Sequence, residues 1–332
     1  MPWRPWSAAA LATRIRPPQH FNMSTQVFCE PLTLCATFLV LTANPGSNSI
    51  ATIKDGLASL ADIIKNISAR CPEAHLSCNV GIGSALWDRL QTAAPKPRQL
   101  HEFRTFRGSQ RTAISTPGDL LLHIRANRRD VVFEFERQLL DALEDSVSVQ
   151  DETTGFRYFD GRDLLGFVDG TANPTGQYVN DAVIINDETD TGALGGCYIV
   201  VQKYMHDMDA WNSLSTSEQE RIIGRTKIDN IELEDAAALE QKSHKTLATV
   251  EDDGEEHDIL RDNMPFGTPG QKSFGTYFIG YSKNLWVIEK MLERMFVGDP
   301  PGKHDKILDF STPVTGTTFY APPRSVLKRL SR

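Results

Sequence analysis

Three short segments carry polar side chains that could take part in catalysis or bind a ligand. The first spans residues 166–174, reads GFVDGTANP, and places one carboxylate, Asp169, between two glycines. Glycines let a flat ligand approach the backbone closely, and an isolated aspartate can act as an acid or a base. The alternative is a purely structural turn in which Asp169 caps a backbone N–H, because Asn173-Pro174 favours a turn. The residues of this segment alone leave both interpretations open.

The other two segments are Ser243-His244 and Arg261-Asp262-Asn263. A histidine, an arginine and an amide so close in the chain could serve a metal ion or an anionic intermediate. His244 could equally be an ordinary polar histidine, because the chain contains 8 of them. The HxxxH and HExxH spacings of zinc sites are absent, as are the P-loop, GxGxxG and GxSxG motifs. Nucleotide-binding and serine-hydrolase functions therefore have no support.

Composition narrows the class of protein further. The 332 residues include 35 Lys and Arg against 43 Asp and Glu, and the resulting net charge of -8 argues against a partner that is nucleic acid. No apolar run is long enough for a transmembrane helix, so no membrane partner is expected. The cysteines form no CxxC pair, which excludes a disulfide scaffold, a zinc ribbon and covalent haem attachment, and favours the reducing cytoplasm. They are Cys29, Cys35, Cys71, Cys78 and Cys197.

The first 22 residues differ from the rest of the chain. They contain Arg4, Arg14 and Arg16 but no acidic residue, and a second methionine, Met23, follows them. The apolar stretch is too short for a signal peptide, and the arginines are not adjacent as a twin-arginine signal requires. We expect residues 1–22 to be a disordered or non-native extension, with Met23 the natural start.

The remaining chain shows the same order of elements twice. Apolar runs bounded by turn residues predict strands, and apolar positions at helical spacing predict helices. In the first half, strands are expected at 35–43, 76–82, 120–125 and 147–151, with one helix after the turn at 44–46 and another over 129–145. The inner face of the first helix comprises Ile53, Leu57, Leu60, Ile64 and Ile67. In the second half, strands are expected at 197–204, 276–281 and 317–321, with helices near 210–223 and over 285–296.

Residues 120–140 and 276–296 repeat strand, polar break and amphipathic helix at equal spacing, which indicates an internal duplication. The predicted fold class is α+β, with two tandem ferredoxin-like domains whose antiparallel sheets pack together in a dimeric α+β barrel-like arrangement. The domain boundaries are placed at 23–165 for the N-terminal domain and 166–332 for the C-terminal domain.

Five motifs occur in an order and spacing that closely resemble the bacterial B-type branch of the dye-decolourising peroxidases. They are GFVDGTANP, SH, GRTK, LRDNMPFG and DFSTPVTGTTFYAP. The resemblance covers residues 30 to 325, and it implies one haem b per chain, held in the C-terminal ferredoxin-like domain. It also implies an enzyme that reduces hydrogen peroxide while oxidising phenols, dyes or other small organic donors.

The resemblance assigns a role to each matching residue. His244 matches the proximal ligand of the haem iron, and Asp305 matches the carboxylate that accepts its Nδ1–H. Asp169 and Arg261 match the peroxide-activating pair, with the arginine the more important, and Asn263 matches a distal amide able to hold water or peroxide. Arg225, in GRTK, matches a partner of a haem propionate, and Phe278 a wall of the distal pocket.

Two other functions are alternatives to a peroxidase for a haem pocket of this kind. A haem-handling protein, which stores haem or releases its iron, needs His244 but not Arg261, and the related chlorite dismutases have a similar fold. The distal Asp169 favours the peroxidase.

The family commonly forms dimers or larger rings, which implies a homo-oligomer. The ending LKRLSR lacks the tail that loads some members into a protein nanocompartment, so loading is not expected. Trp211, Trp286, Tyr277 and Tyr281 are candidates for relaying electrons from bulky donors at the surface.

Overall fold

The computed structural model describes residues 25–28, 32–92 and 94–330, so the expected extension 1–22 lies outside the described residues. Its first half has the β-α-β-β-α-β order of a ferredoxin-like domain. The elements are β1 (Cys35–Ala43), α1 (Ser47–Ser68), β2 (Ser77–Ile82), β5 (Leu120–Ala126), α3 (Arg129–Leu143) and β6 (Val147–Phe156). A short helix, α2 (Ser84–Leu90), and the two-residue strands β3 (Phe106–Arg107) and β4 (Thr112–Ala113) lie in the loop between β2 and β5.

The second half repeats this plan with more irregular connections. Its sheet contains β7 (Cys197–His206), β10 (Leu260–Arg261), β11 (Met264–Thr268), β12 (Ser273–Ser282), β13 (Ser311–Pro313) and β14 (Thr317–Ala321). Its helices are α4 (Tyr178–Val183), α5 (Met208–Ser213), α6 (Thr216–Ile223), α7 (His244–Ala248), α8 (Leu285–Phe296) and α9 (Arg324–Leu327). The hairpin strands β8 (Glu251–Asp252) and β9 (Glu255–Glu256) pair only with each other.

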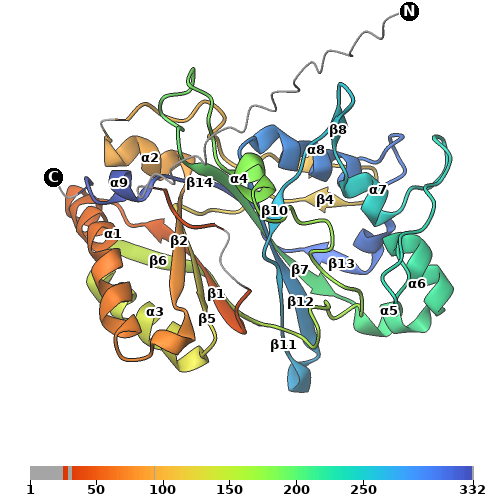
Figure 1. Cartoon of the computed structure of the whole chain (residues 1–332), viewed down its shortest axis with the longest axis horizontal. Coiled ribbons are helices and arrows are strands. Elements are labelled where there is room, and N and C mark those ends of the chain that lie inside the picture. The colour runs from red at the N-terminus through yellow and green to blue at the C-terminus, as the bar shows by residue number, and fades with distance from the viewer. Residues whose placement is uncertain (1–24, 29–31, 93, 331–332) are drawn as a thin grey trace, which may run out of the picture.

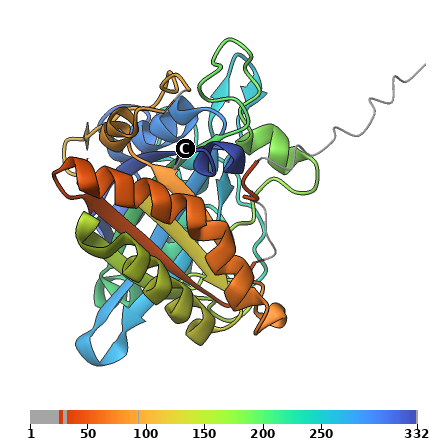
Figure 2. The ribbon, with the colours of Figure 1, turned by 90° about the vertical axis from the view of Figure 1, so that its left-hand side faces the viewer.

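The two sheets pack face to face, as the sequence predicted. Helices α1 and α3 cover the outer face of the first sheet, and α8 covers that of the second (Figures 1 and 2). Along β1, Leu39 and Leu41 pack under the helices, whereas Phe38 and Val40 point into a core shared with the second half. At the centre of this shared core, the rings of Phe38 and Tyr277 stack with centroids 4.1 Å apart.

The sheets also join at one edge, so the strand order runs continuously as β10-β12-β7-β14-β2-β5-β1-β6. The joint is narrow, because β14 and β2 pair only at Tyr320 and Ile82. On the opposite side β6 contacts β11, and a Cβ on Gly155 would lie 2.5 Å from Met264 Cβ. The two domains therefore enclose one interior in a barrel-like arrangement.

The predicted strands at 35–43 and 317–321 and the helix at 285–296 have the expected bounds. The single helix expected near 210–223 is wrong, because two helices, α5 and α6, occupy this stretch. Ser215 interrupts the helix by forming a capping box with Glu218, in which each side chain bonds the other residue's backbone N–H. Strands β10 and β11 were not predicted, because their residues show no strand-like alternation.

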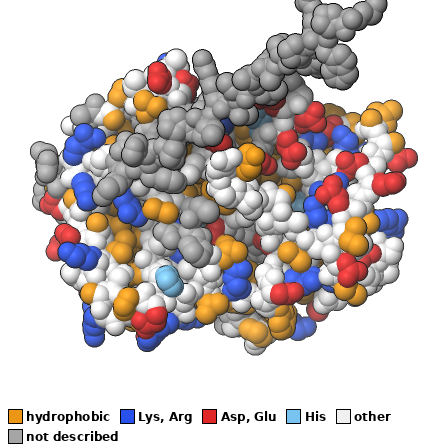
Figure 3. Space-filling view, viewed as in Figure 1, with side chains coloured by type: hydrophobic (Ala, Val, Ile, Leu, Met, Phe, Trp, Pro, Cys, Tyr) orange, Lys and Arg blue, Asp and Glu red, His pale blue; other side chains and the backbone are white. Residues whose placement is uncertain are grey.

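Acidic and basic side chains are interspersed over both halves of the face in Figure 3, in keeping with the net charge of -8. None of the helices in the described part of the chain is both long and apolar enough to cross a membrane.

Candidate functional site

An open cavity lies inside the second half of the molecule. The space between its atoms, with the open mouth included, is about 1480 Å³. All the residues that line it fall between 163 and 311, and they include Asp169, Arg225, His244, Arg261, Asn263 and Phe278. The structure thus brings six of the seven predicted site residues to one cavity, and the seventh, Asp305, lies directly behind His244.

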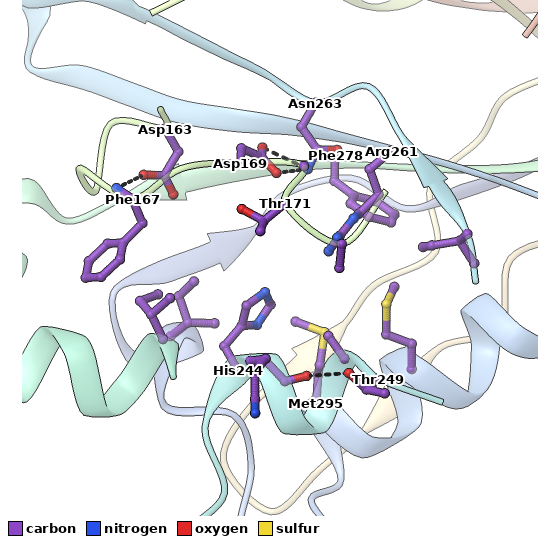
Figure 4. A pocket seen from close by; sticks show the side chains of 18 of the residues that line it. Asp163, Phe167, Asp169, Thr171, His244, Thr249, Arg261, Asn263, Phe278 and Met295 are labelled. Carbon is purple, nitrogen blue, oxygen red and sulfur yellow. Dashed lines mark hydrogen bonds between the residues drawn. The ribbon is translucent and has the colours of Figure 1, made fainter. Parts of the chain in front are cut away.

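His244 projects from one wall of this cavity toward Asp169, Arg261 and Phe278 on the other (Figure 4). It is the first residue of α7, whose N-cap is Ser243. Its Nδ1 lies 2.7 Å from Oδ2 of Asp305, so the imidazole donates to a carboxylate that is only 1% exposed. Its Nε2 has no hydrogen-bond partner among the described residues and is free to bind a ligand in the cavity.

Asp305 is held firmly in this position. Its backbone N–H donates to Met295 O at the end of α8 at 2.8 Å, and its Oδ1 accepts from Ile307 N at 3.1 Å. Burial alone would lower the pKa of His244, but the Asp305 carboxylate outweighs burial and raises it. A histidine that donates to a carboxylate is fixed in one tautomer and becomes a better electron donor, as many metal-ligating histidines are.

Asp169 lies on an irregular loop whose backbone adopts positive φ angles at two glycines. Gly166 and Gly170 have φ angles of +94° and +78°, values that L side chains rarely adopt. The Asp169 carboxylate accepts from Asn263 Nδ2 at 3.1 Å, and the Asn263 Oδ1 accepts from Ile279 N at 3.0 Å. Asp169 therefore bonds a cavity side chain rather than capping a backbone N–H.

Arg261 ends β10 on the same wall as Asp169. Its Nε is buried without a hydrogen-bond partner among the described residues. A buried donor of this kind is costly unless a ligand satisfies it, so the wall fits an anionic or strongly polar group. Phe278 on β12 adds an apolar ring to this wall.

Arg225 also reaches the cavity, but protein groups engage its guanidinium. Its Nη2 lies 2.7 Å from Glu232 Oε2, and its Nη1 donates to Asn230 O at 3.2 Å. A haem propionate would therefore have to share this guanidinium with Glu232.

Sequence reasoning missed two polar residues at the site. Asn173, interpreted only as part of a turn, accepts from Arg261 N at 2.9 Å and donates to Arg261 O at 2.7 Å, so it clamps the Arg261 backbone. Asp163 lines the cavity, and burial, with the charge of Asp169, raises its pKa to about 7. Asn173 lies inside the GFVDGTANP motif, which was a signal for it, whereas nothing in the sequence marked Asp163.

Of the aromatic candidates for an electron relay, Trp211, Tyr277 and Tyr281 are completely buried. Trp286 is partly exposed, and its ring meets that of the cavity-lining His257 edge-on at 4.9 Å.

These features together define a class of protein. A histidine with a carboxylate partner, facing an arginine and an aspartate across one cavity, is the arrangement of a haem peroxidase.

Comparisons with known proteins agree with this class. The family "Dyp-type peroxidase" matches with its N-terminal part over residues 34–157 and its C-terminal part over residues 160–326. A dye-decolorizing peroxidase of Mycobacterium tuberculosis is 51% identical over 301 residues, which are 90% of this chain and 88% of that protein. The solved structure of DyPB from Rhodococcus jostii is 51% identical, has a TM-score of 0.88, and covers 92% of this chain and 98% of its own. A variant of that protein was solved in complex with heme.

The chain belongs to the Dyp-type peroxidase family, and it is a haem peroxidase of the dye-decolorizing type. The haem-handling alternative has a more distant relative in its favour. A deferrochelatase of Escherichia coli is 30% identical over 170 residues, or 46% of this chain.

Proposed function

We propose that this chain binds one haem b with His244 as the iron ligand, and that Arg261 and Asp169 activate hydrogen peroxide on the opposite side. The observation that carries this proposal is the 2.7 Å bond between His244 Nδ1 and Asp305, which leaves Nε2 facing the wall of Arg261 and Asp169. The cavity that His244, Asp169 and Arg261 share, and the unsatisfied Arg261 Nε, fit a haem with a polar ligand on the side opposite His244.

Haem, when bound at His244, would supply the iron centre that reduces hydrogen peroxide and takes electrons from the organic donor. The protein supplies fixed charge and a proton carrier. The Arg261 guanidinium is permanently charged and stabilises negative charge on the departing oxygen as the O–O bond breaks. Asp169 moves a proton between the two peroxide oxygens. Asn263, engaged with both Asp169 and Ile279 N, orients the Asp169 carboxylate.

Three histidines line the cavity, and they allow a discriminating test of the haem ligand. His206 has both ring nitrogens occupied, with Thr276 Oγ1 at 2.9 Å and Ser311 Oγ at 2.8 Å, so it is not expected to bind iron. His244→Ala should lose most of its haem or the spectrum of histidine-ligated iron, and His206→Asn should keep both. The measurement is the haem-to-protein ratio with the absorption spectrum. A normal histidine-ligated spectrum in His244→Ala would show that the assigned ligand is wrong.

The donors are proposed to be phenols, dyes and similar small organic molecules, with bulky ones oxidised at the surface through Trp286. Its partial exposure and its contact with His257 support this site over the three buried aromatic residues. Trp286→Phe should slow oxidation of a large dye several-fold and leave the rate of reaction with peroxide unchanged. Steady-state assays with a large dye and a small phenol would test this, and unchanged dye turnover would contradict it.

A cytoplasmic homo-oligomer is the proposed form of the protein. Exposed apolar side chains in neighbouring segments support an interface with a second copy: Leu32 and Leu34, 58% and 57% exposed, lie near Phe156 and Phe159, 38% and 77% exposed. Light scattering on the purified protein gives the oligomeric state.

A further inference from the structure

Three consecutive residues at the end of β10 point alternately to opposite sides. Arg261 and Asn263 line the cavity, whereas the Asp262 side chain points into the interior between the two sheets, where it is 7% exposed. There its Oδ2 accepts from Arg125 Nη1 at 3.0 Å. Arg125 belongs to β5 of the N-terminal half and is 1% exposed.

The backbone ladder is interrupted where these residues lie. Strand β12 pairs with β10 at Leu260 and Arg261, and pairing resumes on β11 at Met264. Between them, Ile279 N donates to the Asn263 side chain instead of to a backbone carbonyl. The single backbone bond there, from Asp262 N to Ile279 O, is long at 3.3 Å. Side-chain contacts must therefore hold this segment in register.

Buried polar side chains of other strands surround Arg125 and Asp262. Arg125 Nη2 lies 2.5 Å from Asn79 Oδ1 on β2. His123, two residues before it on β5, bonds the Tyr281 hydroxyl at 2.7 Å and places its Nε2 3.9 Å from Asp262 Oδ2. Burial and the Arg125 charge hold the pKa of His123 well below its usual range, so His123 is neutral and Arg125 is the cation that faces Asp262. No helix or strand of the N-terminal half lines the cavity in the described chain, yet Arg125 on β5 bonds Asp262, which lies between two of the cavity's polar side chains.

We propose that Arg125 is a positioning residue for peroxide activation, which acts through Asp262 to hold Arg261 and Asn263 at the cavity wall. This inference rests on the proposed roles of Arg261 and Asn263. A one-residue slip of an extended segment turns every side chain to the opposite face. The anchor at Asp262 therefore adds to the Asn173 clamp on the Arg261 backbone in fixing which way Arg261 and Asn263 point. Replacing a buried ion pair with apolar groups is often neutral or stabilising, so register, rather than stability, is the reason to keep this pair.

The test uses the double variant Arg125→Met/Asp262→Asn in the haem-loaded protein. The double variant leaves neither charge buried alone, so it folds where Arg125→Met by itself would leave Asp262 uncompensated. The matched control is Lys203→Met/Asp151→Asn, which removes both charges of another ion pair between the halves, Lys203 Nζ to Asp151 Oδ1 at 2.9 Å, outside residues 261–263. The readouts are the second-order rate with hydrogen peroxide, measured by stopped flow, and hydrogen–deuterium exchange of the peptide covering residues 259–264.

In the double variant the peroxide rate should fall by about 10-fold to 10²-fold, because a misplacement of about 1 Å can cost that much. Exchange of the 259–264 peptide should accelerate, while Lys203→Met/Asp151→Asn keeps both parent values. Parent-like exchange or a parent-like rate in Arg125→Met/Asp262→Asn would overturn the proposal, as would equal slowing in the control variant. Arg261→Leu, measured alongside, tests the proposed role of Arg261 independently of Arg125. If Arg261→Leu reacts with peroxide at the parent rate, the proposed function is wrong, whatever Arg125→Met/Asp262→Asn does.

Discussion

Arg261 and Asp169 share one wall of the cavity, but they have different tasks. The charge of Arg261 is permanent and its Nε lacks a protein partner, so it is available to a developing oxyanion. Asp169 must exchange a proton, and a second carboxyl group, Asp163, lines the same cavity with its pKa raised to about 7 by burial and by Asp169. A proton carrier can thus be replaced from within the cavity, whereas the other cations that line it, Arg225 and Lys245, are already paired with Glu232.

We therefore expect Arg261→Leu to be the more damaging single change. Loss of one preorganised group of this kind typically costs about 10²–10³ in rate. Asp169→Ala should be milder near neutral pH, below the ~10²–10⁴ of an irreplaceable acid-base group, because Asp163 remains. The measurement is the stopped-flow rate with peroxide at matched haem occupancy. Greater slowing in Asp169→Ala than in Arg261→Leu would reverse the assigned roles.

A companion variant tests why Asp169→Ala is mild. If Asp163 supplies the proton, then adding Asp163→Asn to Asp169→Ala should slow the reaction further than either single change. Equal rates for Asp169→Ala and the double variant would exclude Asp163 as the substitute.

At the level of elements, sequence prediction succeeded where side-chain periodicity is strong. Helix α1 places Ile53, Leu57 and Leu60 on its buried face, as their spacing predicted. It failed for β10 and β11, because both strands are short and their residues show no strand-like alternation. The clamp between Asn173 and Arg261 joins residues 88 positions apart, and no local pattern encodes such a contact. The candidate site residues were found by motif resemblance, and the contacts that hold them required the structure.

Helix α3 contains a carboxyl group that makes stability depend on pH. Glu136 is 8% exposed, and its Oε1 has no partner among the described residues. Burial, together with the nearby Glu152, raises its pKa to about 7. Because the folded state holds this proton more tightly than the unfolded state, the free energy of unfolding should fall as pH rises from about 4.5 to about 7.

Glu136→Gln removes this titration. The variant should match the parent protein near pH 4.5 and exceed it by roughly 1–3 kcal/mol at pH 8, since one pKa unit is about 1.4 kcal/mol. Urea unfolding at both pH values measures the difference. Glu134→Gln, on a more exposed position of the same helix, is the control for general charge effects, and a similar gain at pH 8 in that variant would contradict the burial argument.

On the scale of the whole molecule, the two domains share an interior that neither could bury alone. The shared core takes Phe38 and Leu121 from the first half and Ile199, Tyr277 and Phe319 from the second. The edge joint between β14 and β2 and the Arg125–Asp262 pair cross the same boundary. The cavity belongs to the second half, but its wall strands β7 and β12 present their other side chains to this shared core.

The two halves should consequently unfold as one cooperative unit, and damage to the shared core should release haem. Phe38 is completely buried and stacks on Tyr277 and His123, with ring centroids at 4.1 and 4.7 Å. Phe38→Ala should cost about 3–5 kcal/mol, as removal of a core aromatic ring does. Phe133→Ala on α3, where the side chain is 65% exposed, should change stability by less than about 0.5 kcal/mol. Denaturant curves followed by far-UV circular dichroism and by haem absorbance should coincide in the parent and shift together in Phe38→Ala. If Phe38→Ala instead separates the two curves, with haem lost well after the first half unfolds, the domains are independent and the shared core does not couple them.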